Sequence, residues 1–275
     1  MRLPAMVLAC LIAVAIAAPL VAPFAPDRID LSIRRQPPSA FHWFGTDELG
    51  RDVLARVLYG ARVSLAVGLL SAAVAGAIGV AIGGIAGYAG GAADTALMRA
   101  TDGVLAVPRL PLLMVAGAVL QPTVAMLIVL IGMAGWMETA RVIRAEFKTL
   151  RARDFVDSAR AAGAGPLRVL ARHLLPNAAQ TVAVSVTLAV ARGILLESAL
   201  SFFGVGVRPP QASWGNMLYQ AQATLATEPW LALAPGALIL MTTASVNLTG
   251  DRLAAGTDSS RLSAEQAPGV RDATR

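Results

Sequence analysis

A chain of 275 residues that is 56% hydrophobic and only 15% charged, with a mean hydropathy of +0.63, differs from a soluble domain, in which about a quarter of the residues are charged. The formal net charge of +6 does not indicate nucleic-acid binding, because the basic residues fall in loops between apolar runs, without interleaved aromatic residues. A single cysteine, Cys10, excludes an intramolecular disulfide. The composition predicts an integral membrane protein.

Six apolar segments follow one another along the chain. At roughly 20 residues for each membrane crossing, we expect transmembrane helices at residues 3–24, 63–88, 104–120, 123–136, 178–203 and 230–248. The fourth segment is short and continues into a charged helix. The expected fold is therefore an all-α integral membrane protein with six transmembrane helices.

These segments divide the chain into four parts. Residues 1–26 form an N-terminal transmembrane helix, and residues 27–62 form an extracytoplasmic connector. Residues 63–250 form a core with five transmembrane helices and a long loop at 141–176. Residues 251–275 form a polar tail that is expected to be disordered.

The N-terminal apolar segment has two other interpretations. Val7–Cys10 resembles a lipoprotein cleavage box, and the small residues near Ala22 would suit a secretory signal peptide. Only nine residues precede the cysteine, however, and apolar sequence continues well past it. Because the rest of the chain is itself a multi-span pattern, we expect an uncleaved first span.

Small residues recur at intervals of four in the second apolar segment. Two such stripes are present: Gly68, Ala72 and Gly76, then Gly79, Gly83 and Gly87. Residues at this spacing share one face of a helix and allow another helix to approach closely, which favours association in lipid. The stripes predict tight helix packing rather than a ligand site.

The distribution of basic residues predicts the orientation. Most Lys and Arg residues outside the apolar segments fall in the N-terminus, the loop around Arg99, the long loop at 141–176 and the tail. Cytoplasmic segments carry such an excess. We therefore expect both termini in the cytoplasm, although the connector at 27–62 is also basic.

Three charged residues fall inside apolar segments, where charges are costly and usually face a cavity or a partner. Arg109 lies between Pro108 and Pro111, so we expect it at a helix break near the cytoplasmic surface. Arg192 and Glu197 are five residues apart and do not stack as a pair on one helix, so their partners must come from elsewhere. A role in a pathway or an inter-subunit contact and a structural role both remain open for them.

The end of the long loop has strong local signals. Asp154 is expected to cap a short helix, which Gly163 can end, and Pro166 can open a second helix. The second helix would be amphipathic, with Leu167, Leu170 and Leu174 on one face. Pro176 is expected to stop it. The pattern predicts two short helices and a sharp turn at the membrane surface.

Here the sequence resembles a known family. Asp157-Ser158-Ala159, then Gly163 and Leu175-Pro176, resemble the EAA loop of ABC-importer permeases, with Asp-Ser-Ala in place of the usual Glu-Ala-Ala. The resemblance implies that this loop is cytoplasmic, docks on an ATPase subunit and couples ATP-driven closure to the spans. The residues implied in coupling are Phe155, Asp157, Ser158, Ala159, Arg160, Gly163 and Pro176.

Further stretches resemble the dipeptide/oligopeptide/nickel branch of these permeases. They are residues 44–53, 58–65, 87–91, 97–102, 200–207, 213–217, 229–233 and 247–251, in order and at matching spacing. Two residues depart from the branch: Arg109 replaces a small polar residue, and Glu138 breaks a usual aromatic–proline–glycine turn. The cytoplasmic head before the first span is nearly absent, which leaves a start upstream of Met1 open.

The resemblance implies a function and partners. It implies the ABC type I importer permease fold, with the chain as one permease subunit of an importer of peptides, or of a related solute such as a nickel chelate, in the bacterial inner membrane. The implied partners are two ATPase subunits, a second and different permease subunit, an extracytoplasmic substrate-binding protein and membrane lipid.

The sequence itself predicts no enzyme and no cofactor. It contains no HExxH, no GxSxG and no Gly-rich loop ending in Gly-Lys-Ser/Thr, so ATP hydrolysis is expected on other subunits. The alternatives are a self-contained secondary transporter or channel, a membrane-embedded enzyme, and an exporter permease.

Overall fold

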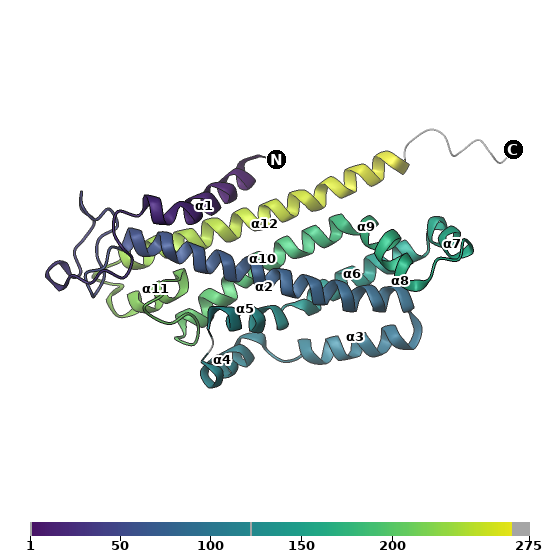
Figure 1. Cartoon of the computed structure of the whole chain (residues 1–275), viewed down its shortest axis with the longest axis horizontal. Helices are drawn as coiled ribbons and strands as arrows, with labels where there is room; N and C mark the ends of the chain where they lie inside the picture. The colour runs from purple at the N-terminus through teal and green to yellow at the C-terminus, as the bar shows by residue number, and fades with distance from the viewer. Residues whose placement is uncertain (1, 122, 266–275) are drawn as a thin grey trace.

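A computed structural model describes residues 2–121 and 123–265, and these residues are almost entirely helical, without a β-sheet (Figure 1). The long helices are α1 (Arg2–Val21), α2 (Val53–Ala89), α10 (Ala179–Phe202) and α12 (Trp230–Glu265). The helices between α2 and α10 are α3 (Gly91–Leu105), α4 (Arg109–Leu120), α5 (Val124–Met133), α6 (Trp136–Arg151), α7 (Asp154–Ala161), α8 (Pro166–Val169), η2 (Leu170–Leu174) and α9 (Leu175–Asn177). The remaining elements are η1 (Leu31–Ile33), α11 (Trp214–Ala221) and η3 (Gln222–Thr224).

Six membrane crossings are obtained if two bent helix pairs each count as one. The four long helices are apolar and long enough to cross a membrane alone; α3 with α4 and α5 with α6 are bent by 72° and 43°. The expected third span at 104–120 is thus only the second half of a bent pair that begins at Gly91. The bend falls at Pro108, since proline disfavours helix at the preceding residue and lacks a backbone donor.

α2 is the central helix of the bundle, and its two small-residue stripes face different neighbours. A side chain on Gly68 or Gly76 would collide with Ile194 or Val186 of α10. Side chains on Gly79, Gly83 and Gly87 would collide with α6, at Thr139, Ala140 and Arg144 respectively. The close packing predicted from the stripes is confirmed, and one stripe serves each neighbouring helix.

α2 begins earlier than the sequence predicted. We assigned residues 27–62 to the connector, but the helix starts at Val53, where the Asp52 carboxylate accepts a hydrogen bond of 2.8 Å from the Ala55 amide. Arg56 is buried in the first turns, beside Asp47, with its Nε 3.5 Å from the carboxylate. Arg56 was thus assigned to the connector, whereas it lies in α2 and forms a buried ion pair.

The ends of the helices gather at two opposite ends of the molecule (Figure 1). Residues 22–52 and α11 lie at one end, and α7, α8 and the turn between α2 and α3 lie at the other. The N-terminal end of α1 and the C-terminal end of α12 both point toward the end that carries α7.

The tail differs from the sequence prediction. Residues 251–265, expected to be disordered, continue α12 as helix, while residues 266–275 lie outside the described part of the chain. The polarity of this segment suggested disorder, but it contains no proline before residue 266, and alanine is among its most frequent residues, which favours the continuation of a helix.

Candidate functional site

The first helix of the predicted coupling loop is α7, which is anchored by one side chain. Val156 is fully buried, whereas Phe155 is 37% exposed and the side chain of Asp157 is 73% exposed. The helix begins at Asp154 with Arg153 as its N-cap, so the predicted cap at Asp154 is wrong by one residue. Asp154 instead lies in the first turn, where a carboxylate suits the positive end of the helix dipole.

α7 ends in a Schellman motif at Gly163. The amide of Ala164 donates to the carbonyl of Ala159 at 3.0 Å, and the amide of Gly163 donates to the carbonyl of Arg160 at 2.9 Å. Gly163 has φ +81°, and a Cβ built there would meet no atom within 4 Å. The predicted helix end at Gly163 is confirmed, and this position is open to a partner.

The second part of the loop is one helical segment with a π-turn in it. Pro166 opens α8, as predicted, but Pro176 lies within the continuation at α9 rather than stopping the helix. Because proline 176 has no amide to donate, the preceding turn opens into η2, and the Leu175 amide donates to the Leu170 carbonyl. The π-turn also changes the buried face.

The buried residues of this segment are Val169 and Leu174, five apart as a π-turn requires, and Leu167 is largely exposed. The prediction that Leu167 shares the buried face is therefore wrong. A regular helix periodicity was assumed where one turn is wider.

The loop packs against three helices, α2, α6 and α10. Val156, Val169 and Leu174 form one apolar cluster with Ile143 and Phe147 of α6. Partly buried side chains of α2 and α10, Val80, Tyr88 and Val182, complete this cluster. The Arg160 guanidinium lies 5.2 Å from the centre of the Tyr88 ring, within range of a cation–π contact. A displacement of α7 would therefore push on α2, α6 and α10 together.

The structure brings the seven residues predicted for coupling to one end of the bundle. We name residues 153–176 the coupling segment. Its outward-facing members are Phe155, Asp157, Ser158, Gly163 and Pro176, while Ala159 and Arg160 are partly covered. Its inward face is held by the apolar cluster, so one side is anchored and the other is free to contact a partner.

Glu197, one of the two intramembrane candidates, is completely buried in α10. Its carboxylate accepts hydrogen bonds from Ser64 of α2 at 2.9 Å and from Ser201 at 2.8 Å. The Ser64 hydroxyl in turn accepts from the amide of Trp214 at 3.1 Å. Glu197 thus joins α2, α10 and α11, and its partners belong to the same chain.

We expect Glu197→Ala to destabilise the subunit by about 1–3 kcal/mol, because the Ser64 and Ser201 hydroxyls lose their buried acceptor. Glu197→Gln keeps the shape of the side chain and one acceptor oxygen, so it should destabilise the subunit clearly less than Glu197→Ala. Thermal unfolding of the two purified variants in detergent measures the difference. Equal melting temperatures for wild type and Glu197→Ala would contradict this role.

Arg192, the other candidate, belongs to a cluster of three charges. Its Nη1 lies 2.7 Å from Oε2 of Glu138, whose Oε1 accepts from Arg109. The three side chains come from α10, from the first turn of α6 and from the start of α4, next to the two helix bends. We name Arg109, Glu138 and Arg192 the Arg–Glu–Arg cluster.

Sequence reasoning missed this cluster. Arg109 and Glu138 were singled out separately, and no periodicity connects residues on three different helices. Arg109 was expected near the cytoplasmic surface, but its contact with Glu138, which also holds Arg192 near the middle of α10, places it at mid-length of the bundle. The available signal was that Arg109 and Arg192 were the two basic residues inside apolar segments, and that Glu138 lay just beyond the end of the fourth segment.

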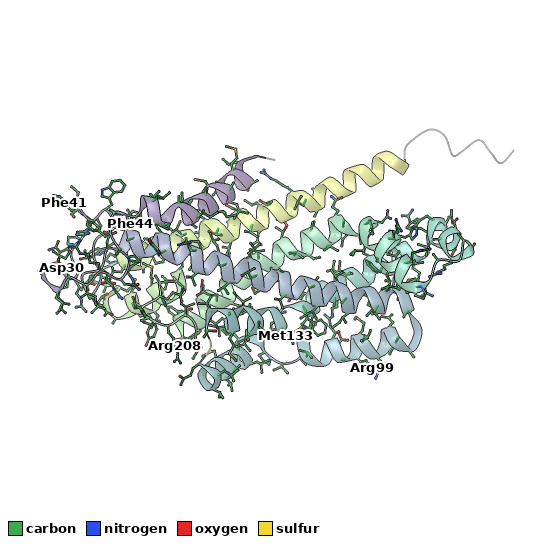
Figure 2. The ribbon with its side chains drawn as sticks, viewed as in Figure 1. Asp30, Phe41, Phe44, Arg99, Met133 and Arg208 are labelled. Atoms are coloured by element: carbon green, nitrogen blue, oxygen red, sulfur yellow. The ribbon has the colours of Figure 1, made fainter. Side chains whose placement is uncertain are left out.

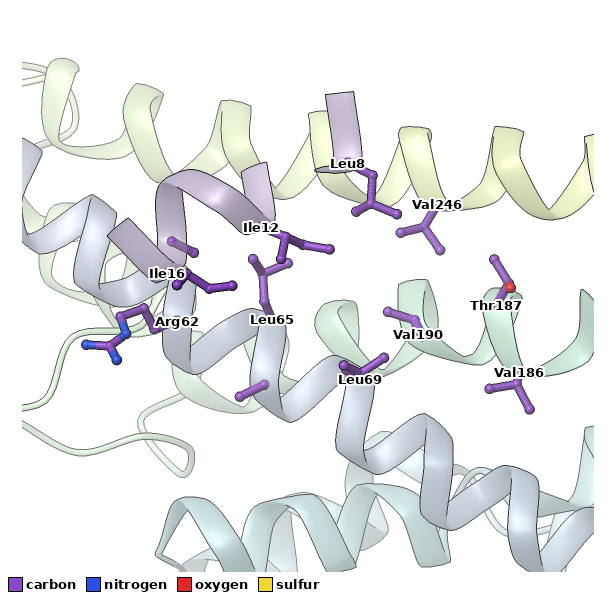
Figure 3. Close-up of a pocket in the computed structure, with 12 residues that line it drawn as sticks. Leu8, Ile12, Ile16, Arg62, Leu65, Leu69, Val186, Thr187, Val190 and Val246 are labelled. Atoms are coloured by element: carbon purple, nitrogen blue, oxygen red, sulfur yellow. The ribbon is translucent and has the colours of Figure 1, made fainter. Parts of the chain in front are cut away.

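A cavity lies on another side of the bundle, between α1, α2, α10 and α12 (Figure 3). It has a volume of about 440 Å³, and most of the residues that line it are aliphatic. Those labelled in the figure include Leu8, Ile12, Ile16, Leu65, Leu69, Val186, Val190 and Val246. No carboxylate lines it, and within the described part of the chain no group of His, Cys, Asp or Glu side chains is arranged to hold a metal.

The comparisons with known proteins agree with this architecture. The pattern of the family described as "Binding-protein-dependent transport system inner membrane component" matches residues 79–259. A peptide permease protein of Brucella suis is 40% identical over 237 residues, 86% of this chain and 78% of the relative. A second Brucella suis protein, named for a peptide transport system, is 39% identical over 92% of this chain and 85% of its own length.

A relative from another species gives the same result. The dipeptide transport system permease protein DppC of Bacillus subtilis is 37% identical over 248 residues, 90% of this chain and 78% of that protein. The family pattern begins within α2 and ends within α12, so it includes both the coupling segment and the Arg–Glu–Arg cluster. This chain belongs to the family of binding-protein-dependent transport system inner membrane components, and it is a multi-pass membrane permease subunit.

Proposed function

We propose that this chain is one of two permease subunits of an ATP-driven importer of peptides, and that residues 153–176 couple it to the ATPase. The observation that carries the proposal is the two-sided construction of the coupling segment. Val156, Val169 and Leu174 anchor it to α2, α6 and α10, while the side chains of Phe155 and Asp157 are exposed. The relatives named as peptide permeases support peptides as the solute; a nickel chelate or another small solute is the alternative.

The mechanism follows from this construction. An ATPase subunit that closes on ATP would move α7 as a rigid body, because a short capped helix transmits displacement rather than absorbing it. The apolar cluster would pass the movement to α2, α6 and α10. The close contacts along the Gly79, Gly83 and Gly87 stripe leave little room for α2 and α6 to slide past each other, so they would rock together.

The proposal includes partners and an orientation. Hydrolysis belongs to two separate ATPase subunits, a second and different permease completes the pathway, and an extracytoplasmic binding protein delivers the solute. The end of the molecule that carries α7 faces the cytoplasm, together with both chain termini. The excess of basic residues in the segments at that end supports this orientation.

The contrasting function, a self-contained secondary transporter or channel, requires a relay of ionisable groups across the membrane. The two candidates for it have separate partners: Glu197 is bound by serine hydroxyls, and Arg192 by Glu138. We therefore place the source of energy outside this chain.

Affinity purification of the tagged chain from native membranes, followed by mass spectrometry, tests the proposal. We expect two ATPase subunits and a second permease in the purified complex, and peptide uptake by the reconstituted complex that requires ATP. Uptake driven by the chain alone under an ion gradient, without any ATPase in the preparation, would contradict it.

A further inference from the structure

The Arg–Glu–Arg cluster lies on an open face of the membrane-spanning part. The side chains of Arg109, Glu138 and Arg192 are 22%, 36% and 38% exposed. Two apolar residues close to the cluster in sequence, Met133 of α5 and Leu195 of α10, are exposed as well. Met133 lies near mid-length of the bundle in Figure 2, far from the loop residues Asp30 and Phe41 at one end. The charges are therefore at membrane depth and only partly covered by their own subunit.

This face does not suit contact with lipid. Charged side chains within the membrane are costly unless they face protein or water, and substrate or ion pathways are among the sites that they mark. The cavity of Figure 3, by contrast, is lined mainly by aliphatic side chains, with Arg62 and Thr187 among them, and no carboxylate lies in its lining. The face with the cluster is thus the side on which a water-filled pathway can lie.

The cluster has one positive charge in excess. Its single carboxylate faces two guanidinium groups, and each arginine uses one nitrogen for its contact with Glu138. Neither guanidinium group has another hydrogen bond or ion pair to the described residues. A guanidinium group carries five N–H donors in a planar fork that matches a carboxylate. The free donors, the excess charge and the exposure point to an anionic ligand.

We propose that Arg109 and Arg192 bind a carboxylate of the solute as it passes through the membrane. This inference rests on the proposed function, peptide import, because a free peptide carries a carboxylate at its C-terminus. Glu138 is a positioning residue: it holds the two guanidinium groups together and offsets one of their charges. A site with one excess charge attracts the anion without retaining it, as transport requires.

The test compares each peptide acid with its C-terminal amide. Dialanine and trialanine, and their amides, are offered to the reconstituted complex of wild type or Arg192→Gln, with the same binding protein. Selection by the binding protein cancels when the acid-to-amide uptake ratio of the variant is divided by that of wild type. We expect the acid-to-amide uptake ratio of Arg192→Gln to be about tenfold lower than that of wild type, the effect of one charge-assisted hydrogen bond. Arg192→Lys should restore part of the ratio.

A matched control is Arg99→Gln, which removes an exposed arginine of α3; in Figure 2, Arg99 lies farther than Met133 from the end that carries Asp30 and Phe41. It should leave the acid-to-amide ratio unchanged. If Arg192→Gln reduces the uptake of acid and amide equally, the inference is overturned in favour of a structural or inter-subunit role. This holds whether or not the second permease is lost from the complex. Wild type that imports no peptide with ATP present would instead refute the proposed function itself.

Discussion

Substitution of Gly163 by aspartate is expected to reduce solute uptake to the level of cells without the permease, while the protein stays in the membrane. Gly163 ends α7 with φ +81°, and apart from its chain neighbours no atom of the described residues lies within 4 Å of an added Cβ. The fold should therefore tolerate aspartate, which is enriched among non-glycine residues at positive φ. The surface at residue 163, however, changes from bare backbone to a charged side chain, beside the exposed Asp157.

Gly91→Asp is the matched control for this variant. Gly91 also has a positive φ, of +55°, and also has open space around an added Cβ, but it is the first residue of α3, directly after the turn from α2. Both variants carry a similar backbone strain, of roughly 1 kcal/mol. Uptake of labelled peptide, with membrane abundance measured in parallel, separates them. Normal uptake by Gly163→Asp, or equal loss in both variants, would contradict a coupling role at Gly163.

The second large effect is expected at Gly83, where α2 and α6 are in backbone contact. A Cβ at this position would lie 2.3 Å from the carbonyl oxygen of Ala140 and 2.9 Å from its Cα, and neither atom can move without moving α6. Alanine normally stabilises a helix by about 1 kcal/mol relative to glycine. Here we expect Gly83→Ala to destabilise by about 1–3 kcal/mol, the usual cost of overpacking, and Gly83→Val to prevent accumulation.

Gly103→Ala tests the same change without the contact, because a Cβ on Gly103 of α3 meets nothing within 4 Å. Its melting temperature in detergent should equal or exceed that of wild type. The comparison measures how closely the two helices are locked together. If Gly83→Ala has the same melting temperature as Gly103→Ala, the contact between α2 and α6 is not rigid. The proposed rocking of these helices as one body then loses its basis.

Much of this architecture could be predicted from local sequence. The small-residue stripes of α2 and the helix end at Gly163 depend on residues close together in the chain, whose spacing or backbone freedom has few solutions. The family resemblance then assigned a role to the coupling segment. That role remains a proposal, since the geometry describes the segment and not its partner.

The errors arose where distant residues interact. Arg56 was assigned to the connector at 27–62, but it lies in α2 and forms an ion pair with Asp47, which lies before the helix. The π-turn before Pro176 depends on which carbonyl accepts the hydrogen bond of the Leu175 amide, and the spacing of apolar residues alone does not specify this. The Arg–Glu–Arg cluster joins three helices, and helical periodicity gives the face of a charge but not its partner on another element.

The claim that α7 docks on an ATPase is tested most directly by site-specific cross-linking. Cys10 is the only cysteine, so Cys10→Ser gives a background into which Asp157→Cys is introduced, with Phe41→Cys at the opposite end as control. Both positions are well exposed, at 73% for the Asp157 side chain and 82% for Phe41. We predict a cross-link from residue 157 to an ATPase subunit and none from residue 41. No ATPase cross-link from residue 157, in a complex that contains the ATPase and imports solute, would contradict the account.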